Sequence, residues 1–168
     1  MSTPVVLLET TSGDILIELN EKKAPVTVAN FLEYVDSGFY NNTIFHRVIR
    51  DFMIQGGGLD IRLNVKPARA PIANEAGNGL SNLRGTVAMA RTAAPHSAAA
   101  QFFINTADNQ ELDHRDDTDE GFGYCVFGEV IDGMDVVDKI QKIKVKDIGS
   151  NDNVPVDSVM ILSASRFE

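Results

Sequence analysis

Short runs of alternating apolar and polar residues recur along most of the chain, and they constrain the fold more than any other feature. In residues 14–19 apolar side chains occupy every second position, which is typical of a strand with one buried face. A Thr11-Ser12-Gly13 turn joins this run to the apolar run before it as a hairpin. Runs of this kind predict eight strands: Val5–Glu9, Asp14–Leu19, Ile44–Ile49, Phe52–Gln55, Thr86–Ala90, Gln101–Asn105, Tyr124–Ile131 and Asp157–Ser163. Short strands separated by turns indicate a mainly β fold, either a closed antiparallel barrel or a sandwich.

Two segments carry a helical pattern instead. The first helix is expected to begin at Pro25 and to end near Gly38, with an apolar face made of Val28, Phe31, Leu32 and Val35. The second is expected to begin after Asp132 as N-cap and to bury Val136, Val137, Ile140 and Ile143. Helices of this kind would close the two open ends of a barrel. The Gly-, Pro-, Asn- and Ala-rich segment 56–81 predicts a long surface loop, and loops of that length are often functional.

Charge and composition exclude several classes of function. The 168 residues carry a net charge of −9, so the chain lacks the basic stripe that nucleic acids require, and it is not expected to bind an anionic membrane. No apolar run has the length of a signal peptide or of a membrane span. The single Cys125 excludes an internal disulfide and suits a reducing compartment. We therefore expect one cytoplasmic domain over residues 1–168, and a monomer, because no heptad or apolar stripe demands a partner.

Arg47 is the most informative single residue. Alternation places it on the same strand face as Phe45 and Ile49, and a guanidinium among apolar side chains must find a partner or reach water. An ion pair with a carboxylate at the barrel rim is the more common role for such an arginine. A tight turn after this strand would form a hairpin that brings Met53 and Gln55 close to Arg47.

The strand Gln101–Asn105 carries an aromatic residue on its polar face. Phe102 and Ile104 form the apolar face, whereas Phe103 shares its face with the polar residues at both ends of the strand. Such a side chain is either a lone exposed aromatic or the floor of a binding groove. The residues alone leave both possibilities open.

Metal and nucleophile chemistry find little support in the sequence. No short ligand spacing joins the three histidines, His46, His96 and His114. Cys125 lies inside an apolar strand, where thiols are usually inert. The acidic run after Arg115 resembles the start of a calcium loop, but Phe127 stands where that loop requires a glutamate. No metal and no cofactor are therefore expected, and a solvated acidic loop is the simpler interpretation.

Several motifs, taken together, resemble the cyclophilin family of peptidyl-prolyl cis/trans isomerases, in particular its bacterial cytoplasmic branch. They follow one another in order over nearly the whole chain: Phe45–Ile49, Phe52–Gly57, Gly85–Arg91, Pro95–Ser97, Gln101–Asn105, Gly123–Gly128 and Asp132–Met134. The resemblance implies a closed eight-stranded antiparallel barrel capped by two helices. It also implies a substrate groove on the outside of the barrel, which would account for an aromatic residue on a polar strand face.

The resemblance assigns a role to each matching residue. It implies a catalytic set in which Arg47 acts on the reacting bond, Phe52 lines the pocket for proline and Gln55 holds the substrate carbonyl. Other residues would bind the peptide: Met53, Phe103 and Leu112 in the proline pocket, Ala90 and Arg91 through their backbone, and His46, Gln101 and Tyr124 in or beside the groove.

The implied activity is the rotation of X-Pro bonds in proline-containing peptides and in unfolded or client proteins, without cofactor or metal. Cyclosporin binding is expected to be weak, because Glu111 stands where the family often has an aromatic contact. Two other functions stay open. A non-catalytic module on the same fold would bind proline peptides, and an acidic calcium-binding or interaction protein would depend on the loop after Asp113.

Overall fold

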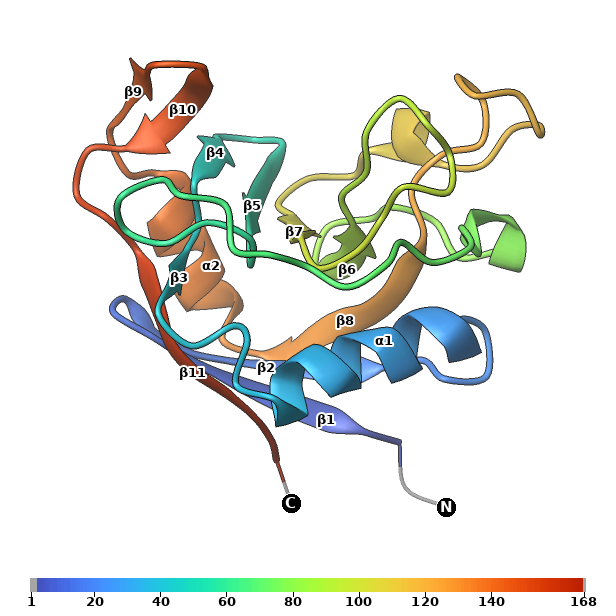
Figure 1. Ribbon diagram of the computed structural model, residues 1–168, viewed down its shortest axis with the longest axis horizontal. Coiled ribbons are helices and arrows are strands. Elements are labelled where there is room, and N and C mark those ends of the chain that lie inside the picture. Colours follow the sequence, from blue (N-terminus) through green and yellow to red (C-terminus); the bar gives the residue numbers. More distant parts are fainter. Residues whose placement is uncertain (1–2, 168) are drawn as a thin grey trace.

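One antiparallel sheet of nine strands dominates the computed structural model, which describes residues 3–167, and this sheet curls strongly on itself (Figure 1). Its strands lie in the order β3-β11-β1-β2-β8-β6-β7-β5-β4. Their bounds are β1 Val5–Thr10, β2 Gly13–Leu19, β3 Thr43–Ile44, β4 Arg47–Ile49, β5 Met53–Gly56, β6 Thr86–Met89, β7 Phe102–Asn105, β8 Val126–Asp132 and β11 Met160–Arg166. The predicted mainly β class is confirmed.

The closed barrel of eight strands is not what the hydrogen bonds show. The sheet ends at β3 and β4, and within residues 3–167 no ladder joins these two strands. Both come from the single strand expected over residues 44–49, which breaks at Phe45 and His46. Before the break the chain pairs with β11, and Phe45 N–H donates to Val159 O at 3.0 Å; after it the chain pairs with β5. Because one short segment changes partner there, the sheet has a ninth strand and stays open.

Two helices pack against the sheet, as expected. Helix α1 spans Pro25–Asp36, and Gly38 follows it with a left-handed φ of 76°. Helix α2 spans Met134–Gln141 and packs against β2, β4 and β5. The expectation that Asp132 caps α2 is wrong, because Asp132 is the last residue of β8 and Gly133 precedes the helix. A Cβ at position 133 would lie 2.4 Å from the carbonyl oxygen of Asp14, so only glycine fits there.

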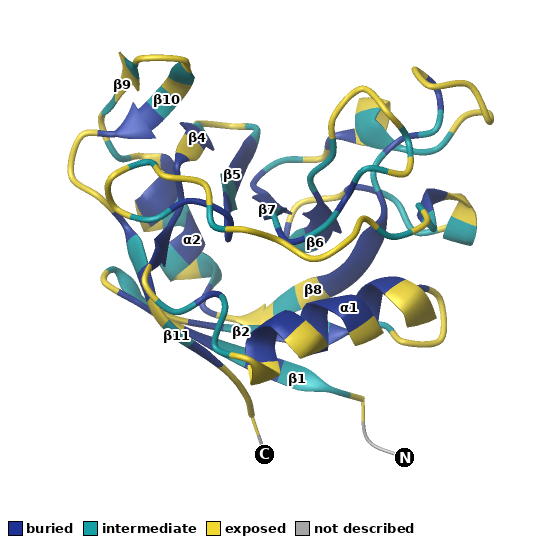
Figure 2. Cartoon of the chain, in the orientation of Figure 1, coloured by how far each residue is buried: buried dark blue, intermediate teal, exposed yellow. Residues whose placement is uncertain are grey.

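The apolar face of α2 is narrower than predicted. Val137 and Ile140 are fully buried, whereas Val136 and Ile143 are half-buried and pack at the margin of the core. The buried side of α1 faces the sheet, and the long predicted loop is largely exposed (Figure 2). In that loop the structure has one short 3-10 turn, η1 Ala76–Asn78, and no residue from 60 to 75 is buried.

The apolar residues form two clusters on opposite faces of the sheet. Strand β7 shows the division: Phe102 and Ile104 belong to the main core inside the curl, as predicted, whereas Phe103 belongs to a small second cluster. The buried members of this outer cluster are Met53, Ala88, Phe103 and Val126. The outer cluster matters for function, because a cluster on the outside of a sheet can support a surface pocket.

A small hairpin near β4 was missed by the sequence prediction. Strands β9 (Val145–Ile148) and β10 (Asn151–Pro155) pair with each other outside the main sheet. Gly149, which has a φ of 59°, forms the turn between them, and the sequence Gly149-Ser150 is the signal that could have revealed it. Among residues 3–167 there is no helix with the length and apolar character needed to cross a membrane.

Candidate active site

A pocket of about 240 Å³ opens beside the outer cluster, and most of the predicted site residues line it. The lining residues are Arg47, Phe52, Met53, Gln55, Ala90, Arg91, Phe103, Leu112 and Tyr124. They come from the β4–β5 hairpin, from β7, from the chain after β6 and from the connection between β7 and β8, which contains the 3-10 turn η2 Gln110–Leu112. The fold therefore collects residues that are far apart in the sequence. His46 and Gln101 do not line this pocket.

Arg47 lies at the polar side of the pocket. It stands directly opposite Gln55 on the β4–β5 hairpin, and its Nη1 donates to Gln55 Oε1 at 3.3 Å. Arg47 is exposed, and across residues 3–167 it forms no ion pair with a carboxylate. The structural ion pair considered from the sequence is therefore not formed. The expectation that Phe45 shares this face is also wrong, because the break before Arg47 sends Phe45 into the core.

The other walls of the pocket are apolar. Phe52 follows a turn closed by its own N–H, which donates to Ile49 O at 3.1 Å, and this turn provides the bend that Phe52 needs to reach the pocket. Phe103 is 3% exposed, so it is part of the floor of a pocket and not a lone surface aromatic. Met53 packs beside it, and Leu112 completes the wall. A hydrophobic cavity of this size, next to a cationic donor, suits a small apolar ring attached to a polar amide.

Tyr124 and Arg91 form the rim opposite the hairpin. The ring of Tyr124 packs edge-on against Phe103 with 5.6 Å between centroids, and the guanidinium carbon of Arg91 lies 4.9 Å from the Tyr124 centroid. Arg91 is held in place because Nε donates to Gly123 O at 2.9 Å and Nη2 donates to Asp119 O at 3.1 Å. These contacts connect the rim to the acidic loop.

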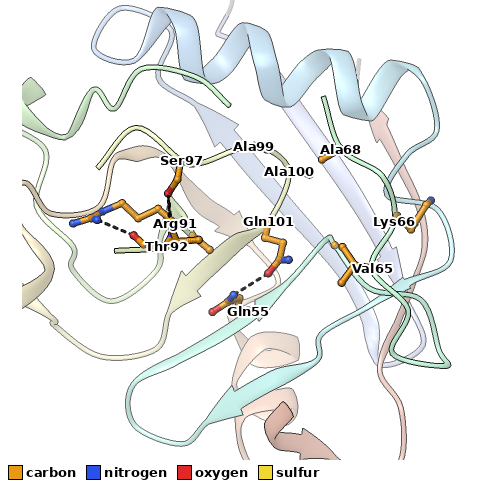
Figure 3. Close-up of a pocket in the computed structure, with 12 residues that line it drawn as sticks. Gln55, Val65, Lys66, Ala68, Arg91, Thr92, Ser97, Ala99, Ala100 and Gln101 are labelled. Atoms are coloured by element: carbon orange, nitrogen blue, oxygen red, sulfur yellow. Dashed lines mark hydrogen bonds between the residues drawn. The ribbon is translucent and has the colours of Figure 1, made fainter. Parts of the chain in front are cut away.

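A second pocket of about 190 Å³ adjoins the first, and Figure 3 shows it. Gln55, Ala90 and Arg91 line both pockets. Gln101 lies in this second pocket, where its Oε1 accepts a hydrogen bond from Gln55 Nε2 at 3.1 Å. The sequence prediction missed the other lining residues of this pocket, which are Gly58, Val65, Lys66, Ala68, Thr92, Ser97, Ala99 and Ala100. The long loop 56–81 was a signal for the first four of these residues only.

The charged residues that line the two pockets are all basic. They are Arg47, Lys66 and Arg91, although the chain as a whole has a net charge of −9. The groove formed by the two pockets is therefore a local cationic surface on an acidic protein.

His46 is buried and lines neither of the two pockets. Its side chain is 7% exposed, and Nδ1 has no hydrogen-bond partner among residues 3–167. Burial, with the charge of Arg47 as a smaller cause, lowers the pKa of His46 to about 4. The imidazole is therefore neutral near pH 7.

The other groups considered from the sequence, a thiol nucleophile, a metal site and the acidic loop, show no sign of catalytic chemistry. Burial raises the pKa of the Cys125 thiol to about 11, so it is not a reactive nucleophile. No group of three or more His, Cys, Asp or Glu side chains suited to a metal ion occurs within residues 3–167. In the acidic loop, the Asp116 carboxylate accepts a hydrogen bond from Thr118 N at 3.0 Å, and its hydrogen bonds to Thr118 lower the pKa of Asp116.

Comparison with known proteins decides the family. The model of the family "Cyclophilin type peptidyl-prolyl cis-trans isomerase/CLD" matches residues 5–166. The chain belongs to this family. The resemblance seen in the sequence motifs and the predicted enzyme class are both confirmed.

Cyclophilins from bacteria are among its most similar relatives. Peptidyl-prolyl cis-trans isomerase B of Escherichia coli is 55% identical over 164 residues, which cover 98% of this chain and 100% of the relative. Peptidyl-prolyl cis-trans isomerase cyp18 of Streptomyces antibioticus is 56% identical and covers 98% of both chains. Among solved structures, a cyclophilin of Cryptosporidium parvum crystallised in the presence of the dipeptide Ala-Pro is 28% identical. That match has a TM-score of 0.80 and covers 98% of this chain and 99% of that one.

Proposed function

We propose that this cyclophilin catalyses the cis/trans rotation of X-Pro peptide bonds and that Arg47 stabilises the twisted amide. The observation that carries the proposal is the position of Arg47, whose exposed guanidinium lies at the edge of a largely apolar pocket and forms no ion pair with a carboxylate of residues 3–167. The pocket would hold the proline ring, and Arg47 would reach the amide nitrogen of the same residue. The Ala-Pro dipeptide of the Cryptosporidium parvum crystals supports a proline-containing substrate.

The chemistry of the reaction requires only what the pocket contains. Rotation about an X-Pro bond breaks amide resonance and meets a barrier of about 20 kcal/mol, with uncatalysed times of tens to hundreds of seconds. No covalent bond changes, so the reaction needs no nucleophile and no general base. In the twisted state the proline nitrogen becomes pyramidal and regains a lone pair, which can accept a charge-assisted hydrogen bond from Arg47. The planar ground state does not offer that acceptor.

The magnitude of the catalytic effect is consistent with one such bond together with desolvation of the amide and anchoring of the substrate. Reaching the millisecond range needs about four powers of ten in rate, or about 5.5 kcal/mol. A charge-assisted hydrogen bond in a partly dry site contributes about 3 kcal/mol. Desolvation of the amide against Phe52 and Phe103, and anchoring of the substrate carbonyl by Gln55, would contribute the remainder. The backbone next to Ala90 and Arg91 would receive the extended peptide.

The test is a cis/trans exchange rate measured by NMR on a short X-Pro peptide. Wild type is compared with Arg47→Ala and with Arg50→Ala, a matched control because Arg50 is also exposed but does not line the pocket. We expect wild type and Arg50→Ala to accelerate exchange equally, and Arg47→Ala to lose about 100-fold or more of kcat/KM.

The possible outcomes separate the parts of the proposal. Folded wild type that binds the peptide without accelerating exchange would support the non-catalytic binding module instead. Activity that survives in Arg47→Ala would retain the isomerase and refute the arginine mechanism.

We also propose that cyclosporin binds only weakly. Glu111 is exposed and directly precedes the pocket residue Leu112, so an apolar macrocycle lying there would desolvate a carboxylate. Titration calorimetry should give a lower Kd for Glu111→Phe than for wild type. Equal affinities would show that position 111 does not contact the ligand.

We further propose that residues 1–168 act as one cytoplasmic, monomeric domain. The main core contains residues from Val6 to Ala164, so both ends of the described chain contribute to it. The buried, free Cys125 suits a reducing compartment. Light scattering would check the mass in solution, and a single cooperative unfolding transition would check the one-domain arrangement.

A further inference from the structure

Three buried asparagines lie behind the candidate proline pocket, and none of them lines it. Asn82 precedes β6, Asn105 is the last residue of β7, and Asn109 lies just before η2. Asn82 and Asn105 are 0% exposed and Asn109 is 4% exposed. Burying three primary amides costs free energy unless each is hydrogen-bonded, so each side chain needs partners within the fold.

Their side chains form one directed chain of hydrogen bonds. Asn109 Nδ2 donates to Asn105 Oδ1 at 2.9 Å, and Asn105 Nδ2 donates to Asn82 Oδ1 at 3.0 Å. Asn82 Nδ2 then donates to Asp113 Oδ1 at 2.9 Å. An ionised carboxylate only accepts hydrogen bonds, so Asp113 sets the direction of the whole chain. Hydrogen bonds arranged in series polarise one another, so the orientation of one amide depends on all of them.

The second N–H of each amide is also used, and two of these bonds hold pocket walls. Asn109 Nδ2 donates to the carbonyl oxygen of Phe52 at 2.8 Å, and Asn82 Nδ2 donates to that of Tyr124 at 3.3 Å. The remaining N–H, on Asn105, donates to Thr86 Oγ1 at 2.9 Å.

The backbone around these amides holds a third wall. Leu112 N–H donates to Asn109 O at 2.9 Å, and Tyr124 N–H donates to Leu112 O at 2.9 Å. Phe52 lies between β4 and β5, whereas Leu112 and Tyr124 lie on the connection between β7 and β8. The amide chain therefore holds the walls at Phe52 and Tyr124 directly, and the backbone of Asn109 holds the wall at Leu112.

We propose that Asn82, Asn105 and Asn109, oriented by Asp113, are positioning residues that set the width of the proline pocket. This inference rests on the proposed function. The four residues act through the walls and do not line the pocket themselves. Arg47 is outside the chain of amides, since it is held on the β4–β5 hairpin by Gln55. Loosening the amide chain should therefore weaken the binding of proline in ground state and transition state alike, which raises KM and leaves kcat nearly unchanged.

The experiment compares two variants at opposite ends of the chain, Asn109→Ala and Asp113→Leu, which removes both acceptor oxygens of Asp113 at a similar side-chain volume. A matched control is Thr10→Val, which removes a buried hydroxyl that donates to Gly13 O at 2.6 Å in the distant β1–β2 hairpin. Kinetics are measured well below the unfolding temperature of each protein. We expect KM to rise about tenfold in both variants, with kcat within about twofold of wild type, and no change in the control.

The double variant Asn109→Ala/Asp113→Leu adds a readout that a merely structural role would not move. Because both changes interrupt one chain, the rise in KM should be much smaller than the product of the two single effects. Unchanged KM in the folded variants, or effects that simply multiply, would overturn the inference. Should Asn109→Ala fail to fold, Asp113→Leu decides alone, because it removes the acceptor of the chain and leaves no cavity.

Wild type provides the reference for the proposed function. If wild type shows no isomerase activity, the proposed function has failed. If wild type is active and the variants behave like Thr10→Val, only the positioning inference has failed.

Discussion

The buried His46 should lower the free energy of unfolding as the pH falls from about 6.5 to about 4, and the size of this loss follows from the shift of its pKa. In the native state its pKa is lowered from 6.5 to about 4, first by burial and then by the charge of Arg47. In the unfolded chain the imidazole returns to its ordinary pKa. Between these two values the unfolded state binds more protons, so falling pH favours unfolding. Stability from this residue is therefore complete above about pH 6.5 and is lost toward pH 4.

The size of the effect follows from the two pKa values. Each pKa unit corresponds to about 1.4 kcal/mol. The free energy of unfolding should therefore fall by about 2 kcal/mol at pH 5 and by about 3 kcal/mol at pH 4, relative to pH 7. That loss is a large share of the 5–15 kcal/mol typical of a folded domain, so it should be easy to detect.

The assay is urea unfolding of wild type and His46→Leu at several pH values. Three carboxyl groups also have lowered pKa values, those of Asp36, Asp116 and Asp138, each with a hydrogen-bonded side-chain partner as the largest cause. They are present in both proteins, so they cancel in the difference. The free energy of unfolding of wild type, relative to that of His46→Leu, should decrease by about 3 kcal/mol from pH 7 to pH 4. Parallel curves would show that His46 ionises freely in the native state, which would refute the burial argument.

Four further outcomes follow from the same structure. Phe103→Ala should cost about 3–5 kcal/mol of stability, because it empties the floor of the pocket, and should lower kcat/KM; calorimetry and the exchange assay measure the two. The kcat/KM of wild type should stay flat between about pH 6 and pH 8, because His46 is neutral there and no general base is involved; a steep bell-shaped profile would contradict this. Cys125 should resist iodoacetamide at pH 8 until the protein unfolds, as mass spectrometry would show. A proline peptide with glutamates should have a higher kcat/KM than its lysine counterpart, and added salt should narrow the difference, since Arg47, Lys66 and Arg91 are the charged residues lining the groove.

Much of the fold could be predicted from local sequence alone. Strand β2 and helix α1 follow directly from the period of their apolar residues, and the termini of α1 follow from Pro25 and Gly38. The division of β7 into an inner face with Phe102 and Ile104 and an outer face with Phe103 is also a local property. These predictions hold because alternation along a chain is decided by neighbours within a few residues.

The candidate site could be predicted only through the resemblance to the cyclophilins. Alternation placed Arg47 beside Phe45, whereas the structure puts these side chains on opposite sides of a strand break. A period of two assumes an unbroken strand, and no local signal marks the point at which a strand changes partner. The asparagine chain behind the pocket was equally hidden, because Asn82, Asn105 and Asn109 have no common spacing in the sequence.

The sequence by itself determined most of the strands, the two helices and the family, since each depends on local pattern or on motifs in order. Only the tertiary structure decided that the sheet stays open, that Arg47 forms no ion pair with a carboxylate of residues 3–167, and that the pocket walls at Phe52 and Tyr124 share one support of buried amides. These features depend on hydrogen bonds between residues far apart in the chain, such as Asn109 with Phe52. The direction of such bonds is settled when the segments meet, because a buried amide must satisfy every donor within the space that folding leaves for it.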